Sequence, residues 1–274
     1  MAKLTAIQMV STPDVDDNFS QLENQLASLD RELPQLVVVP ECFVCFGGRD
    51  QDLLELAKKP SNNILERLQT LAQRYQCWLI AGTIPVLAED GNRFRAASFC
   101  IDEQGAVRGR YDKIHLFDVD VGDATGTYLE SRHTEPGDSV VLIDSPFGKI
   151  GMAVCYDVRF AGLFQAMQEA DVLVLPSAFT QRTGEAHWHA LLRARAIEMQ
   201  SYVIGANQGG IHPNGRETFG NSCVYSPWGE LLSCLDKGPG VVSATFDNDL
   251  IASIRQRMPI RQHTKFRSYF ERIS

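Results

Sequence analysis

Short apolar runs alternate with longer amphipathic stretches along most of this chain, and this alternation restricts the folds open to it. Strands are expected at 4–10, 36–39, 78–84, 94–101, 149–154, 172–175, 202–206, 221–226 and 241–246. Helices are expected at 17–29, 160–169, 185–199 and 248–257, with one or two more within 53–75. Strands that alternate with helices predict a layered α/β fold. Because we find neither a sequence repeat nor an interdomain linker, we expect a single domain over residues 1–274.

The charge balance and the cysteines restrict the partners and the compartment. With 26 basic and 34 acidic residues, the formal net charge is −8, which argues against nucleic acid or an anionic membrane as the main partner. The first residues, MAKLTAIQMV, do not match a signal peptide, and no run approaches the roughly 20 apolar residues of a membrane span. Seven cysteines at irregular spacing favour free thiols in a reducing compartment. We therefore expect a cytoplasmic protein without a membrane span.

Reactive side chains follow three of the apolar strands. VVVPECF carries Glu41, YDKIHLFD carries Lys113, and GKIGMAVCYDVRF carries Cys155. In α/β sheets, ligands bind outside the carboxyl ends of the strands, so these side chains are candidates for one site. A carboxylate, an ammonium group and a thiol together can hydrolyse an amide through a covalent intermediate.

Each group has a defined role in such a reaction. The thiolate of Cys155 is the nucleophile, and because a thiol is mostly protonated at neutral pH, Glu41 would take its proton. Lys113 and a backbone N–H group would stabilise the oxyanion that forms. Glu41 would then protonate the leaving amine and activate the water that releases the acyl-enzyme.

Each residue also has a plainer interpretation. Cys155 could be a small buried apolar side chain, and Glu41 could favour a helix N-terminus through its charge. Lys113 could be a solvated loop charge. None of the three is decisive alone.

Other polar residues suggest different chemistry. His115 could pair with a cysteine, or it could be a packed polar residue. Cys42-x-x-Cys45 could be a redox pair or half of a metal site, but a second cysteine pair is missing. His187 and His189 suggest a metal hydrolase, yet residues at i and i+2 point to different sides of a helix. We therefore expect neither a metal nor a cofactor.

The three motifs occur together, in the same order, in a known group of enzymes. Lys113 follows Glu41 by 72 residues and precedes Cys155 by 42. With these motifs, essentially the whole chain resembles the nitrilase, or carbon–nitrogen hydrolase, superfamily. The resemblance implies that Glu41, Lys113 and Cys155 form the catalytic set. It also implies a four-layer α–β–β–α sandwich and a homodimer or larger homo-oligomer.

Members of the superfamily often use a second glutamate between the lysine and the cysteine. The resemblance implies Glu130, in YLESRHTEPG, with the nearby Glu135 as the alternative. This loop is similar to that of the deaminated-glutathione amidases in the Nit branch. Other shared stretches are HLFDVDV, CYDVRF, LLRARAIE and SPWGE. One departure is Gly220-Asn221-Ser222, where the related segment ends in Gly-His-Ser.

The resemblance implies hydrolysis of a small anionic ω-amide with release of ammonia. Deaminated glutathione is the first candidate substrate, and an ω-amidase acting on α-ketoglutaramate is the alternative. A nitrilase, an N-carbamoyl hydrolase or an inactive scaffold of the same fold are further possibilities. The distal carboxylate of a long substrate needs a cationic partner, for which Arg132, Arg182 and Arg216 are candidates.

Several more residues are expected near the site. Tyr156 could offer its backbone N–H to the oxyanion, whereas Asp157 and Arg159 are better explained as an ion pair that holds the nucleophile turn. The residues expected to contact substrate or oxyanion are Phe117, Tyr156, Arg159, Phe179 and Thr183.

Overall fold

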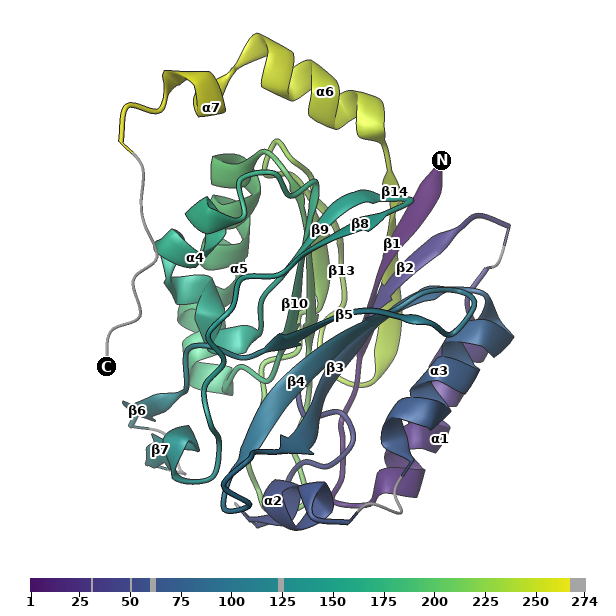
Figure 1. Ribbon diagram of the computed structural model, residues 1–274, viewed down its shortest axis with the longest axis vertical. Helices are drawn as coiled ribbons and strands as arrows, with labels where there is room; N and C mark the ends of the chain where they lie inside the picture. The colour runs from purple at the N-terminus through teal and green to yellow at the C-terminus, as the bar shows by residue number, and fades with distance from the viewer. Residues whose placement is uncertain (31, 50, 60–62, 123–125, 267–274) are drawn as a thin grey trace.

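Two six-stranded β-sheets lie face to face in the computed structural model (Figure 1), which describes residues 1–30, 32–49, 51–59, 63–122 and 126–266. The first sheet has the order β14 (Gly240–Phe246), β1 (Ala2–Gln8), β2 (Gln35–Val38), β3 (Trp78–Leu87), β4 (Phe94–Ile101), β5 (Val107–Asp112). The second has the order β13 (Leu231–Cys234), β12 (Cys223–Tyr225), β11 (Tyr202–Asn207), β10 (Val172–Ser177), β9 (Gly148–Met152), β8 (Leu142–Ser145). A two-stranded hairpin, β6 (Asp118–Asp120) with β7 (Thr127–Leu129), lies apart from both sheets.

Helices cover the outer faces of both sheets (Figure 1). The first sheet is covered by α1 (Val15–Ala27) and α3 (Ile64–Tyr75), and the second by α4 (Ala161–Ala166) and α5 (Gln181–Met199). The other helices are α2 (Asp52–Ala57), α6 (Asn248–Arg257) and α7 (Ile260–His263). The predicted four-layer α–β–β–α sandwich is therefore confirmed.

The residues of β2 explain why an uninterrupted apolar run forms a strand here. Leu36 and Val38 belong to the core cluster between the two sheets, which also contains Ile150 and Val172 of the second sheet. Val37 belongs instead to the cluster that packs the first sheet against α1 and α3. Because successive side chains of a strand point to opposite faces, a strand with both faces buried needs apolar residues at every position.

The predicted elements differ from the observed ones mainly at the sheet edges. No range was predicted for β5, although Lys113 was expected to follow a strand, and β8 and β13 were not predicted. These strands carry exposed or half-exposed residues, as in VRGRYD and LLSC, and so lack the continuous apolar pattern of a central strand. Helix α5 begins at Gln181, earlier than expected, because the Thr180 side chain accepts a hydrogen bond from the Thr183 backbone N–H.

The core between the sheets contains residues from both halves of the chain. This supports the prediction of a single domain, which stays a prediction. Among the described residues, no helix has the length and apolar character needed to cross a membrane.

Candidate active site

The ends of three strands, from both sheets, bring Glu41, Lys113 and Cys155 to one cavity of about 510 Å³. Glu41 follows β2, Lys113 follows β5, and Cys155 follows β9. All three side chains are buried, and Lys113 Nζ donates a hydrogen bond to Glu41 Oε1 at 2.7 Å. The face-to-face packing of the two sheets thus places the three residues together, as their positions at strand ends predicted.

Cys155 lies at a sharp turn between β9 and a short 3-10 turn (Cys155–Arg159). Its φ of 47° is in the left-handed region, which non-glycine residues rarely adopt. Burial raises the pKa of the Cys155 thiol well above its usual value, and the neighbouring Glu41 carboxylate raises it further, outweighing Lys113 and a hydrogen bond from the Ala178 backbone N–H. The resting cysteine is therefore a neutral thiol that donates a hydrogen bond to Glu41, which is the arrangement a general base requires.

Hydrogen bonds to the backbone of Glu41 and of the next residue hold Glu41 in position. The Glu41 carbonyl oxygen accepts a hydrogen bond from Gln208 Nε2 at 3.1 Å. The next residue, Cys42, has a φ of 55°, and its N–H donates to Thr83 Oγ1 at 2.9 Å. These contacts fix the direction in which the Glu41 carboxylate leaves the chain.

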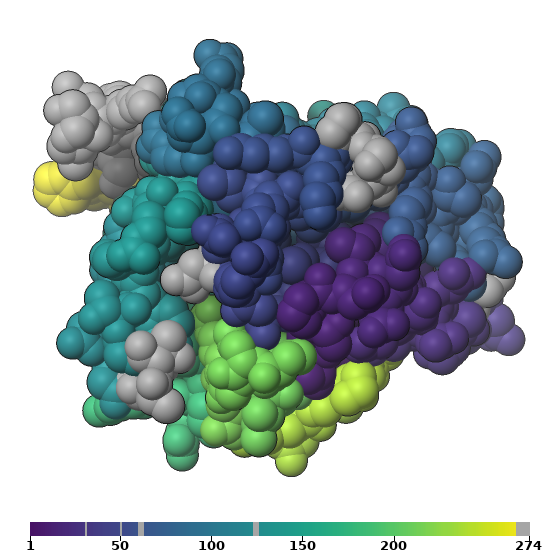
Figure 2. Space-filling model, turned by 90° about the horizontal axis from the view of Figure 1, so that it is seen from below, coloured from purple at the N-terminus to yellow at the C-terminus, as the bar shows by residue number. Residues whose placement is uncertain are grey.

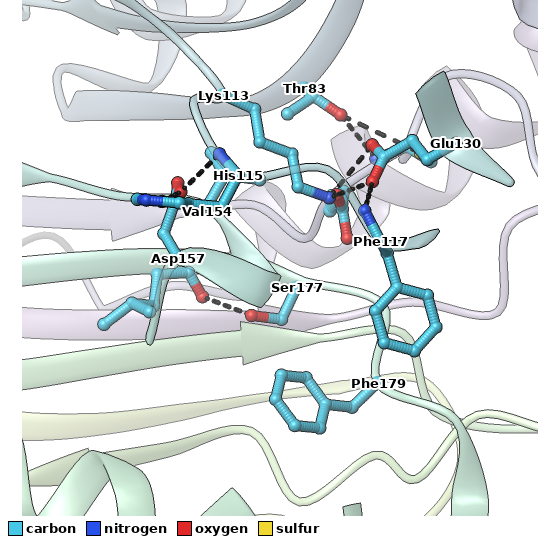
Figure 3. A network of polar contacts seen from close by, with 12 residues as sticks. Thr83, Lys113, His115, Phe117, Glu130, Val154, Asp157, Ser177 and Phe179 are labelled. Carbon is cyan, nitrogen blue, oxygen red and sulfur yellow. Dashed lines mark hydrogen bonds and ion pairs between the residues drawn. The ribbon is translucent and has the colours of Figure 1, made fainter. Parts of the chain in front are cut away.

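A second carboxylate, Glu130, holds Lys113 from the other side (Figure 3). Lys113 Nζ lies 3.0 Å and 2.8 Å from the two Glu130 oxygens, and Glu130 Oε2 also accepts the Phe117 N–H at 2.6 Å. Burial opposes the charge on Lys113, but Glu130 and Glu41 outweigh it and raise the pKa of Lys113 well above its usual value. Burial raises the pKa of Glu130, an effect that Lys113 opposes.

Glu135 lies outside the cavity lining. Its carboxylate bonds Arg95 at 2.6 Å and Arg93 at 3.2 Å on the neighbouring surface. Of the two glutamates left open by the sequence, only Glu130 therefore lies beside Lys113.

The turn that carries Cys155 is anchored by Asp157, whose side chain is fully buried. Asp157 accepts hydrogen bonds from the Tyr111 hydroxyl at 2.8 Å and from the Val154 N–H at 2.9 Å. It also accepts the His115 N–H at 3.0 Å and lies 2.7 Å from His115 Nδ1. His115 is therefore a packed polar residue, stacked on the Phe160 ring, rather than a partner of the Cys155 thiol.

Arg159 does not form the expected ion pair with Asp157. Its guanidinium bonds His187 Nδ1 at 3.2 Å and packs over the rings of Tyr156 and Phe179, without lining the cavity. Four other expected contact residues do line the cavity: Phe117, Tyr156, Phe179 and Thr183. Arg159 thus supports two of the aromatic walls from behind.

Segments distant in sequence complete the cavity (Figure 2). Seen from the end where α2 lies, the segments around α2, β7 and residue 215 meet on one face, and they contribute Phe46, Tyr128 and Arg216 to the lining. The Arg216 guanidinium lies 4.8 Å from the centre of the Phe46 ring and 4.8 Å from that of Tyr128. Both aromatic residues were missed from the sequence: Phe46 stands in no motif, and Tyr128, although it begins YLESRHTEPG, carries no reactive group that would single it out.

The residues considered for metal or redox chemistry are dispersed. Cys42 and Cys45 both line the cavity as free thiols, whereas His187 bonds Arg159 and His189 bonds Tyr225 and Asn221. Within the described part of the chain, no three His, Cys, Asp or Glu side chains are grouped closely enough to hold a metal ion.

Comparison with known proteins gives consistent matches over the whole fold. The family model described as carbon-nitrogen hydrolase matches residues 3–256. The deaminated glutathione amidase of Yersinia enterocolitica is 37% identical over 97% of this chain and 93% of its own length. That of Synechocystis is 39% identical over 95% of this chain and 97% of its own length.

Solved structures agree with these matches. The Caenorhabditis elegans NitFhit protein has a TM-score of 0.89 at 32% identity, covering 97% of this chain and 66% of that one. Saccharomyces cerevisiae Nit3, a member of branch 10 of the nitrilase superfamily, has a TM-score of 0.85 at 29% identity and covers 97% of both chains.

Proposed function

This chain belongs to the carbon–nitrogen hydrolase family, and on that premise we propose that it is an amidase that cuts a small anionic ω-amide, deaminated glutathione first among them, and releases ammonia. The observation that carries the proposal is the buried contact of Cys155 and Lys113 with the Glu41 carboxylate inside a cavity large enough for such a substrate. The amidase names of relatives with 37–39% identity support the same substrate.

The first half of the reaction forms the acyl-enzyme. Cys155 sulfur attacks the amide carbon while its proton passes to Glu41, which already accepts a hydrogen bond from the thiol. Negative charge develops on the carbonyl oxygen, where Lys113 and the Tyr156 backbone N–H stabilise it. Glu41 then returns the proton to the leaving nitrogen, and ammonia departs.

The second half releases the product. Glu41, again a carboxylate, takes a proton from water as the water oxygen attacks the thioester carbon. The tetrahedral oxyanion forms at the same position and collapses to the free acid and the Cys155 thiol. One carboxylate therefore serves both steps.

Glu130 is a positioning residue in this mechanism. Its two oxygens hold Lys113 Nζ, and its bond to the Phe117 N–H ties the ammonium to the aromatic wall of the cavity. In a buried site, a lysine with two carboxylate partners keeps its charge and a fixed direction.

Arg216 is the partner we propose for the distal carboxylate of the substrate. Of the three candidate arginines, Arg132 and Arg182 do not line the cavity, and Arg182 donates a hydrogen bond to the Gly122 carbonyl. Arg49 does line it, but is already paired with Asp52 and Glu55. Arg216 is stacked between two rings, and no acidic side chain in the described ranges forms an ion pair with it. Its planar guanidinium can thus bind a carboxylate with two hydrogen bonds.

The decisive experiment measures ammonia release from deaminated glutathione and α-ketoglutaramate in parallel, with a nitrile and an N-carbamoyl compound as further substrates. Faster turnover of deaminated glutathione supports the proposal. A preference of tenfold or more for α-ketoglutaramate makes the protein an ω-amidase, and no turnover of any amide supports the inactive scaffold.

We further propose a single-domain, cytoplasmic enzyme that forms a homodimer or larger homo-oligomer. Exposed apolar side chains at Ile197, Trp228 and Leu231 support self-association. Sedimentation velocity measures the oligomeric state. A monomer at micromolar concentration would contradict the proposed homo-oligomer.

A further inference from the structure

Two cysteines face each other across strands β12 and β13, outside the cavity. Cys223 and Cys234 are direct partners in this antiparallel pair, so their side chains point to the same face of the sheet. Their thiols are hydrogen-bonded to each other. Cys223 is fully buried, whereas Cys234 is exposed to solvent. The pair therefore has one sulfur that a reagent can reach and one that it cannot.

A histidine from α5 lies beside the exposed thiol. His189 Nε2 is 3.1 Å from Asn221 Oδ1, and Cys234 Sγ is 3.8 Å from the same oxygen. Because an amide oxygen only accepts hydrogen bonds, Nε2 carries a proton. The other ring nitrogen lies 2.8 Å from the Tyr225 hydroxyl. The imidazole is thus held in place next to the sulfur by two neighbours.

The contact between Cys234 and His189 shifts the pKa values of both side chains. The hydrogen bond from Cys223 lowers the pKa of Cys234 well below that of an ordinary thiol, and the bond from His189 lowers it further. The same contact with Cys234 raises the pKa of His189. The catalytic Cys155 has the opposite shift, to a neutral buried thiol. Of the two thiols in this pair, the exposed Cys234 is therefore the one expected to react as a thiolate.

From this geometry we propose that Cys223 and Cys234 form a peroxide-sensitive dithiol, in which Cys234 is the reacting sulfur and Cys223 the resolving one. The Cys234 thiolate attacks one oxygen of hydrogen peroxide, the O–O bond breaks, and the products are Cys234 sulfenic acid and hydroxide. Cys223 sulfur then attacks the sulfenic sulfur, the S–O bond breaks, and the hydroxyl leaves as water with the Cys223 proton. Both sulfurs are oxidised to one disulfide, and one peroxide is reduced to one water and one hydroxide, which becomes a second water by taking a proton from the solvent.

The two strands can hold this bond without rearrangement. Directly opposed residues of an antiparallel pair have Cα atoms about 4.5–5.5 Å apart. Disulfides span Cα separations of about 4.4–6.8 Å. The pair is also separate from the active site, because neither cysteine nor His189 belongs to the cavity lining formed by the described residues.

Peptide mapping tests the proposal directly. The chain has no Lys or Arg between Arg216 and Lys237, so trypsin releases both cysteines in one peptide, residues 217–237. After hydrogen peroxide at pH 6 and alkylation of remaining thiols, this peptide should lose two hydrogens and carry no alkyl group. Cleavage after Glu230 should then leave its two halves joined until a reductant is added. A peptide with both thiols still alkylated, at a peroxide concentration that oxidises free cysteine in the same buffer, would overturn the proposal.

Three variants separate the roles. Cys223→Ser should stop at the Cys234 sulfenic acid, which dimedone traps, whereas Cys234→Ser should leave Cys223 unreacted. His189→Gln should slow alkylation of Cys234 by iodoacetamide at pH 6 by about tenfold or more, with a much smaller effect at pH 9, where an ordinary thiol also ionises. If Cys223 is the first to react, or if His189→Gln leaves the rate at pH 6 unchanged, the assignment of roles is wrong. The Cys155→Ser protein serves as background, so that the catalytic thiol does not consume peroxide.

Discussion

Glu41 and Lys113 are 72 residues apart in the chain, yet Glu41 Oε1 and Lys113 Nζ lie 2.7 Å apart, with both side chains buried. Removing either charge would leave the other without part of its compensation in a medium that solvates charge poorly. The buried ion pair therefore contributes both to the chemistry of the site and to the stability of the fold around it.

Replacing Cys155 with Ser should abolish amide hydrolysis and leave the fold intact. The Cys155 sulfur lies in contact with the Glu41 base, and a serine hydroxyl is a far weaker nucleophile. We expect a loss of several decades in kcat, as for other removed nucleophiles. Cys234→Ser, an exposed thiol outside the cavity, is the matched control and should keep its activity in the same ammonia assay. Substantial turnover by Cys155→Ser would refute the mechanism.

Glu41→Gln should be as damaging as loss of the nucleophile. Glutamine keeps the shape of the side chain but cannot accept a proton, and both half-reactions depend on that transfer. Glu135→Gln removes a carboxylate bonded to Arg95 outside the cavity and is the matched control. Steady-state kcat should be lost in Glu41→Gln and kept in Glu135→Gln. If Glu41→Gln keeps near-normal kcat, the general base lies elsewhere, and Glu130 is the next residue to replace.

Arg216→Gln should lower kcat/KM for deaminated glutathione by about tenfold to a hundredfold, because hydrogen bonds to a charged group are worth roughly 1.5–3 kcal/mol. Hydrolysis of a neutral amide should change much less, since it lacks the distal carboxylate. Arg132→Gln, at an exposed position outside the lining, is the control. Equal losses on both substrates would show that Arg216 supports the cavity rather than the carboxylate.

Removal of metal ions should leave the activity unchanged. The mechanism assigns stabilisation of the oxyanion to Lys113 and a backbone N–H group, so no step depends on a Lewis acid. Dialysis against EDTA followed by the ammonia assay measures this. Loss of activity that zinc restores would contradict the assignment.

Acidification should destabilise the protein through His212. Burial lowers the pKa of this imidazole to about 4, and its Nδ1–H donates to the Ser11 carbonyl oxygen at 2.9 Å. Below the unfolded-state pKa of about 6.5, the unfolded chain binds a proton that the folded ring does not, so stability falls as the pH decreases towards 4. Between pH 7 and pH 5 the expected loss from this group is about 2 kcal/mol.

Urea unfolding at both pH values measures the effect of His212. The loss between pH 7 and pH 5 should be smaller in His212→Gln than in the unsubstituted protein, whatever the variant's absolute stability. An equal loss in both proteins would place the acid sensitivity at other groups.

The sequence by itself determined the layered fold and the three catalytic candidates. Runs such as LVVV, rich in β-branched residues, favour strands buried on both faces, and Glu41 and Cys155, which follow such runs, are carried to the sheet ends. Lys113 was identified by its motif rather than by the strand before it. These are local properties, because they depend on residues within a few positions of one another. The edge strands β5, β8 and β13 lacked this local signal, because their residues are partly exposed.

Only the tertiary structure decided which side chains meet. Glu130 and Glu135 stand five residues apart with the same chemistry, but the chain path after β7 turns one towards Lys113 and the other towards Arg95. Asp157 likewise accepts hydrogen bonds from Tyr111 of β5 and His115 of the loop after it, and not from Arg159 two residues further along the chain. Such choices depend on how distant segments pack against one another. A side chain at a strand end can reach several neighbours, and burial then selects the partners that leave no charge uncompensated.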